Sequence, residues 1–296
     1  MNQQPLEVVA LVLENARQQI LLAQRPKHKH QGGLWEFPGG KVEKKETLVS
    51  ALQREIQEEL GYTPPNPEPL IKITHSYSDL TVRLNIFYQQ DNSPVVHAAE
   101  QQPLNWVDKK DLHKQSMPAA DKAILDAIVL PRIMRSITLE NPNSLDVFNQ
   151  SSGVIVQIDH LPITTQVSIL QKIKSQDLPR HVFIQANPQL LKDHTTLNRH
   201  YLSPQHIADN QDTKAGLISS QCHNADDIAK AIKKKCDVII FSAASEHGFD
   251  WLTYNTFTKT CSVPVYAHHT QLTSKDVTQC RSQFGQGILL KAISLK

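Results

Sequence analysis

The stretch between Gly40 and Tyr62 constrains this chain most, because it predicts a helix with two different faces. At about 100° per residue, one arc of about 80° holds only apolar residues. These are Val49, Leu52, Ile56 and Leu60. An adjacent arc of about 100° holds Glu55, Glu58 and Glu59. We therefore expect a helix from about Thr47 to Leu60, ended by Gly61, that packs one face on a core and presents three carboxylates on the other.

Three clustered carboxylates repel one another unless a cation neutralises them. A hard divalent cation with oxygen ligands is the natural partner, and Mg²⁺ also binds substrate phosphates, so we expect Mg²⁺, with Mn²⁺ as an alternative. The pattern indicates metal-assisted attack on a phosphate chain. Glutamates on a helix usually form a solvated face. Nine residues at fixed spacing, however, match by chance on the order of one in 10⁹ positions or fewer.

Further elements are predicted around this helix. Strands are expected at Val8–Leu13, Ile20–Ala23, Ile71–Tyr77 and Val82–Tyr88. A second helix is expected from Pro118 to Leu130, because proline favours the first turn and Pro131 disfavours continuation. A salt bridge between Arg54 and Glu46 is expected to hold the first helix to the glycine-rich loop before it.

The segment from Gly40 to Tyr62 matches the signature GX5EX7REUXEEXGU of the Nudix hydrolases without a departure. Residues 36–40, Glu-Phe-Pro-Gly-Gly, resemble the segment before this signature in the MutT-type 8-oxo-dGTP diphosphatases. Arg25, Glu100 and Asp121 fall where that group has a substrate-contacting arginine, a further catalytic glutamate and a base-recognition residue. The resemblance covers about residues 5–130.

The resemblance implies an αβα sandwich with a mixed sheet and substitution at a phosphorus atom of a nucleotide. Glu55, Glu58, Glu59 and Glu100, with the carbonyl of Gly39, would hold the metal. Glu55 or Glu100 would take the proton from the attacking water, and Arg54 and Glu46 complete the catalytic set. Arg25 would neutralise phosphate charge, and Phe37 would pack on the base. His30 is a candidate phosphate contact, although an isolated histidine near a loop is more often solvated.

Asp121 is the residue expected to select the base of the nucleotide. An 8-oxoguanine offers an N7–H donor where guanine offers only an acceptor. An ionised aspartate accepts from that group, but only a protonated one also donates to O6. The alternative is an acidic residue that complements the start of a helix.

The second half of the chain alternates strand-like and helical runs, which predicts a parallel sheet or a short (β/α)8 TIM barrel. The expected strands are Val154–Ile158, Val182–Gln185, Gly216–Ser219, Val238–Phe241, Val263–Ala267 and Gly287–Leu290, with a helix at Ala225–Lys235. The fold class is therefore α/β in two domains: an αβα sandwich over residues 1–130, then a TIM-barrel-like domain over residues 132–296.

Residues 132–296 resemble the thiamine-phosphate synthases and their TenI-like relatives, mainly through Ser220-Gln221-Cys222-His223 at a strand-to-helix junction. The departures are substantial. The phosphate-binding glycines are replaced by residues 267–270, Ala-His-His-Thr, and an expected metal-binding aspartate is missing near Asn187. We expect this domain to be catalytically degenerate. His268 and His269 are a weak candidate for a metal site, because adjacent strand residues point to opposite faces.

Composition excludes several classes of protein. The net charge of +2 gives no sign of nucleic-acid binding. No apolar run is long enough for a membrane span or a signal peptide. The spacing of the four cysteines fits neither a zinc site nor a disulfide scaffold, so we expect reduced thiols and a cytoplasmic location. The expected partner is a small-molecule nucleotide, and the oligomeric state is left open.

Three functions remain open at this point. The first is hydrolysis of 8-oxo-dGTP to 8-oxo-dGMP and pyrophosphate, which would protect the nucleotide pool and limit mutation during DNA replication and repair. The second is the same chemistry on a pyrimidine or thiamine-pathway diphosphate. The third makes the second domain a ligand-binding or scaffold module.

Overall fold

The computed structural model describes residues 5–27, 31–76, 80–139, 153–174, 182–193, 199–202, 217–242 and 248–295. The chain forms two compact units. The first contains residues 1–128, with the short segments 258–262 and 281–284, and the second contains the remainder. The two units interleave in sequence, so a single boundary near residue 130 stays a prediction.

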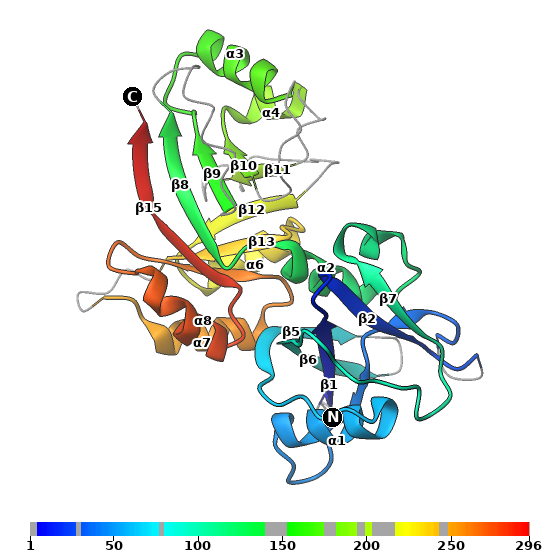
Figure 1. Ribbon diagram of the computed structural model, residues 1–296. Coiled ribbons are helices and arrows are strands. Elements are labelled where there is room, and N and C mark those ends of the chain that lie inside the picture. The colour runs from blue at the N-terminus through cyan, green and yellow to red at the C-terminus, as the bar shows by residue number, and fades with distance from the viewer. Residues whose placement is uncertain are drawn as a thin grey trace. The chain divides into compact units, whose positions relative to one another are not determined.

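The first unit is built on a seven-stranded mixed sheet (Figure 1). Its main path runs β3-β2-β1-β6-β5, with β4 paired to β1 and β7 paired to β2. The strands are β1 (Leu6–Glu14), β2 (Gln19–Gln24), β3 (Trp35–Glu36), β4 (Gly39–Lys41), β5 (Glu68–Ser76), β6 (Thr81–Gln90) and β7 (Leu104–Asp108). Only the β1–β6 pair is parallel, so the sheet is predominantly antiparallel.

Helices cover both faces of this sheet, and β1 is therefore buried on both sides. Val9, Leu11 and Leu13 pack in one cluster with Leu52 and Ile56 of α1 (Leu48–Leu60). The alternate residues of the strand pack in a second cluster with α2 (Lys122–Val129). The period of two along the strand thus builds two cores. The predicted αβα sandwich is confirmed.

The second unit is a closed barrel of eight strands in the order β10-β11-β12-β13-β14-β15-β8-β9, and every pair is parallel. The strands are β8 (Ile133–Leu139), β9 (Gly153–Gln157), β10 (Val182–Gln185), β11 (Arg199–Leu202), β12 (Leu217–Cys222), β13 (Val238–Phe241), β14 (Val265–His268) and β15 (Gly287–Leu295). Helices between them include α3 (Ile163–Lys174), α4 (Pro188–Asp193), α6 (Ala225–Lys233), α7 (Trp251–Thr260) and α8 (Val277–Ser282) (Figure 1). The predicted TIM-barrel-like architecture is confirmed.

The interior of the barrel is filled by side chains from alternate strand positions. Met134, Ile155, Phe183, Ile240 and Tyr266 are fully or almost fully buried in one cluster. Such layers are typical of parallel barrels of eight strands. Among the described residues, no helix has the length and apolar character needed to cross a membrane.

The structure differs from the sequence predictions in several elements. The second helix begins at Lys122 rather than Pro118, because residues 119–121 form a 3₁₀ turn. The strands β7, β8 and β11 were not predicted. In the first unit, the short strands β3 and β4 form where a glycine-rich loop was expected.

Candidate active site

Helix α1 carries the predicted acidic face, and local sequence fixes both of its ends. The Thr47 side chain accepts a hydrogen bond from the Ser50 N–H at 3.1 Å, which caps the first turn. Gly61 ends the helix in the left-handed conformation at φ 62°. Leu52, Ile56 and Leu60 of the predicted apolar face are buried, but Val49 is exposed because it lies in the first turn. Glu58 keeps 58% of its side chain exposed. The helix therefore holds its carboxylates at fixed positions.

Arg54 ties this helix to the loop that precedes it. Its Nε donates to Glu46 at 3.1 Å, and its Nη2 donates to Glu46 at 2.9 Å and to the Lys41 carbonyl at 3.0 Å. Its Nη1 donates to Glu55 at 2.8 Å. The hydrogen bond from Arg54 lowers the pKa of Glu46. The predicted Arg54–Glu46 salt bridge is present, and Arg54 also orients Glu55.

Two glycines let the preceding strand approach these carboxylates. At Gly39, φ is 152° and an added Cβ would lie 2.1 Å from the Val9 carbonyl oxygen. At Gly40, an added Cβ would lie 2.2 Å from Glu55 Oε2. The N–H of Gly39 donates to Glu59 Oε2 at 3.0 Å. A side chain at either position would therefore displace backbone or a candidate ligand.

Glu59 is the most perturbed of the acidic residues on the helix. Burial, together with the nearby carboxylates of Glu36, Glu100 and Glu55, raises its pKa to about 8 against the lowering effect of the Gly39 N–H. The 97–102 segment brings Glu100 into this group. Its Ala99 N–H and its Gln102 amide both donate to the Glu59 carbonyl oxygen, at 3.0 and 2.9 Å.

In the described conformation these groups do not surround one point. No set of three or more His, Cys, Asp or Glu side chains there is close enough to hold a metal ion. Glu55 is turned onto Arg54, and Glu59 onto the Gly39 N–H. The donor set nevertheless fits a hard divalent cation, because the groups gathered near Glu59 offer carboxylate oxygens, which such an ion prefers as ligands.

A second acidic group involves Glu36, which the sequence did not single out. Glu36 on β3 forms an ion pair with Arg25, and its carboxylate helps to raise the pKa of Asp121. Asp121 is only 6% exposed, and its Oδ2 has no hydrogen-bond partner among the described residues. Burial is the main reason that the pKa of Asp121 rises to about 7. The Glu36 carboxylate thus contributes to the raised pKa of both Glu59 and Asp121.

The remaining predicted site residues are Phe37, His30 and Glu100, and they lie in different surroundings. Phe37 is 5% exposed and packs in the core beside α2, so little of its ring is available to a base. His30 lies outside the described residues. Glu100 is exposed, on the segment that docks on the end of α1.

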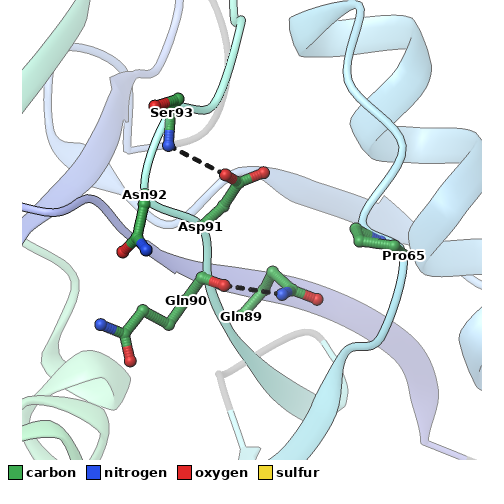
Figure 2. A pocket seen from close by; sticks show the side chains of 6 residues that line it. All are labelled: Pro65, Gln89, Gln90, Asp91, Asn92 and Ser93. Carbon is green, nitrogen blue, oxygen red and sulfur yellow. Dashed lines mark hydrogen bonds between the residues drawn. The ribbon is translucent and has the colours of Figure 1, made fainter.

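A separate pocket of about 610 Å³ lies at the end of β6, lined by Pro65, Gln89, Gln90, Asp91, Asn92 and Ser93 (Figure 2). Asp91 is its only charged residue. That carboxylate already accepts from the Ser93 N–H at 3.0 Å and from the Tyr62 hydroxyl at 2.9 Å. No predicted site residue lines this pocket, and its charge does not suit a phosphate chain.

Comparison with known proteins bears on the first unit. The family model described as NUDIX domain matches residues 9–127. The CTP pyrophosphohydrolase of Escherichia coli (strain K12) is 36% identical over 130 residues, which are 44% of this chain and 96% of that protein. This chain belongs to the Nudix family. It is a hydrolase of the class that acts on nucleotide pyrophosphates.

Other relatives of this Nudix hydrolase are 8-oxo-dGTP diphosphatases. The 8-oxo-dGTP diphosphatase of Proteus vulgaris is 39% identical over 87 residues, covering 29% of this chain and 78% of that protein. The 8-oxo-dGTP diphosphatase of Escherichia coli (strain K12) is 28% identical over 120 residues, covering 40% and 93%. The solution structure of the E. coli ORF135 protein is 35% identical, covers 42% of this chain and 88% of that one, and has a TM-score of 0.38. The family model ends at residue 127, so it assigns no family to the barrel.

Proposed function

We propose that this Nudix hydrolase converts 8-oxo-dGTP to 8-oxo-dGMP and pyrophosphate with Mg²⁺, or Mn²⁺ in its place. Glu55, Glu58, Glu59, Glu100 and the Gly39 carbonyl would hold the metal. When bound, the metal neutralises phosphate charge and activates the attacking water. Glu55 or Glu100 accepts the proton of that water. Arg54 and Glu46 keep Glu55 in position through their salt bridge.

Arg25 supplies positive charge for the phosphate chain in this proposal. In the described structure it is paired with Glu36. The pair keeps the guanidinium on the same side as Asp121, whose pKa is lowered by Arg25 and raised by Glu36. The base and the phosphates would then be held by neighbouring groups of one site.

The observation that carries the choice of base is the buried Asp121 carboxyl with a pKa near 7. A protonated carboxyl donates one hydrogen bond and accepts another. 8-Oxoguanine presents the complementary pair, an N7–H donor beside the O6 acceptor. Guanine presents two acceptors on that edge, so the same carboxyl leaves one group unpaired, which a buried site penalises strongly.

Cytosine is the second candidate base, because the CTP pyrophosphohydrolase is 36% identical over nearly its whole length. Its amino group and N3 also present a donor beside an acceptor. A thiamine-pathway pyrimidine diphosphate is the third candidate substrate. It is suggested by the resemblance of residues 132–296 to the thiamine-phosphate synthases.

Initial rates with Mg²⁺ on 8-oxo-dGTP, dGTP, CTP and a hydroxymethylpyrimidine diphosphate test the proposal. We expect 8-oxo-dGTP to exceed dGTP in kcat/KM by at least about 100-fold, as expected for a buried hydrogen-bond pair. The Glu58→Gln variant is the control for contaminating phosphatase. A higher kcat/KM for CTP or for the pyrimidine diphosphate would replace 8-oxo-dGTP as the assigned substrate.

A further inference from the structure

The inner face of the barrel becomes polar towards the carboxyl ends of its strands. Ile240 and Tyr266 belong to the buried interior cluster. Residues two positions further along each strand point inward again. These are Ser242, directly after β13, and His268, the last residue of β14. Gln221 pairs with Ile240 in register, and the ring of His223, the residue directly after β12, contacts the Ser242 carbonyl.

The strand register places three of these residues side by side. Cys222, Phe241 and Ala267 are partners across β12, β13 and β14. One residue further along each strand stand His223, Ser242 and His268. Neighbouring strands are about 4.8 Å apart, so the Cα atoms of the two histidines are about 10 Å apart across Ser242. Two imidazoles at that spacing can reach one point from opposite sides.

Backbone carbonyls fix the tautomer of both rings. The Nδ1 atom of His223 lies 3.1 Å from the Ser242 carbonyl oxygen, and the Nδ1 atom of His268 lies 2.9 Å from the Leu289 carbonyl oxygen. A carbonyl oxygen only accepts, so each Nδ1 carries the hydrogen. In the neutral ring the lone pair is then on Nε2. Histidines that bind metals are usually oriented by this kind of hydrogen bond.

A metal ion can reach both rings from the end of the barrel. His268 is half-buried and His223 is exposed, so the two rings are accessible among the described residues. A neutral Nε2 lone pair is the form in which imidazole binds a metal ion.

We propose that His223 and His268 form a two-imidazole site for a borderline divalent metal ion, such as Zn²⁺, at the carboxyl end of the barrel. Imidazole nitrogen suits Zn²⁺, Ni²⁺ or Cu²⁺ better than Mg²⁺. No third His, Cys, Asp or Glu joins the pair in the described part of the chain. The site is independent of the acidic groups on α1.

This pairing differs from the one suggested by the adjacent His268 and His269. The Nδ1 atom of His269 accepts from the Gln271 N–H at 3.3 Å, so its hydrogen is on Nε2. That tautomer has no lone pair left for a metal. The register across β12, β13 and β14 supplies His223 as the partner instead.

Zn²⁺ titration of the full chain, freed of any purification tag, tests this site. Excess Mg²⁺ is present to occupy the carboxylate site. We expect one equivalent of Zn²⁺ whose affinity falls at least tenfold in His223→Gln and in His268→Gln. The matched control is His113→Gln, an exposed histidine of the first unit, which should leave the affinity unchanged. Equal affinity in all four proteins, or loss in only one of the two barrel variants, would overturn the pairing.

A measurement on the unmodified chain guards against variants that fail to fold. Zn²⁺ should protect His223 and His268, but not His113, from diethyl pyrocarbonate, as read by peptide mass spectrometry. Unprotected barrel histidines at saturating Zn²⁺ would also overturn the proposal. Hydrolysis of nucleotides is not used as a readout, so failure here is distinct from failure of the proposed hydrolase function.

Discussion

Replacement of Asp121 by asparagine should remove a large pH dependence from the stability of the protein. Burial raises the pKa of this carboxyl from 3.8 to about 7. Between these two values the native state holds a proton that the unfolded state has released. Stability therefore falls as pH rises through this window, and it levels off once the native carboxyl is also ionised.

The size of the change in unfolding free energy follows from the pKa shift of Asp121. A change of about 3 pKa units corresponds to about 4 kcal/mol at about 1.4 kcal/mol per unit. About 3 kcal/mol of this falls between pH 5 and pH 8. The amide of D121N is neutral throughout and has nearly the same shape. We therefore expect D121N to gain about 3 kcal/mol in unfolding free energy relative to the parent protein over that range.

Urea unfolding of both proteins at several pH values measures this difference, and the ¹³C shift of the Asp121 carboxyl reports its titration directly. The affinity for 8-oxo-dGTP should change over the same pH range, because only the protonated Asp121 carboxyl donates and accepts a hydrogen bond at once. The KM for 8-oxo-dGTP should rise above pH 7 in the parent and stay level in D121N. A carboxyl that titrates near pH 4, with a pH-independent stability difference, would refute the reasoning.

Four further perturbations test individual contacts. Glu58→Gln should lower kcat by at least about 100-fold with little change in unfolding, since Glu58 is 58% exposed; an active variant would remove Glu58 from the metal site. Gly40→Ala should reduce activity by displacing Glu55, which an added Cβ would approach to 2.2 Å, and circular dichroism should show an intact fold. Arg54→Lys should lower kcat by about tenfold or more, because lysine cannot reproduce the fork onto Glu46 and Glu55; unchanged kinetics would make the salt bridge dispensable. Glu36→Gln should lower the pKa of Asp121 below 7, measured by the same ¹³C titration, and an unchanged midpoint would assign the shift to burial alone.

The sequence predicted the parts of the site that depend on local geometry. The helix face, the stop at Gly61 and the Arg54–Glu46 salt bridge all follow from spacings within about 20 residues. Each was confirmed because a helix converts spacing into direction with little influence from the rest of the fold. The barrel was predicted for a similar reason, since repeated strands and helices indicate a parallel sheet.

Contacts between distant segments were not predictable in this way. Glu36 reaches Arg25 because β2 and β3 pair with Ala23 opposite Glu36. Asp121 approaches the same carboxylate from a turn 85 residues later in the chain. The sequence offered only the opposite charges of Arg25 and Glu36 as a signal. In the barrel, likewise, adjacency suggested His268 with His269, whereas the strand register placed His268 beside Ser242 and near His223.

These distant contacts explain why the Nudix signature alone does not determine a substrate. The signature fixes carboxylates on one helix, and this arrangement serves any phosphate chain. In the proposed function, selection of a base depends on Asp121, whose pKa is raised by burial and by Glu36 and lowered by Arg25. None of these three residues lies between Gly40 and Tyr62. On this proposal, two chains with the same signature differ in substrate wherever the charges around the base-selecting residue differ, and here the pairing of β2 with β3 brings Glu36 to Arg25.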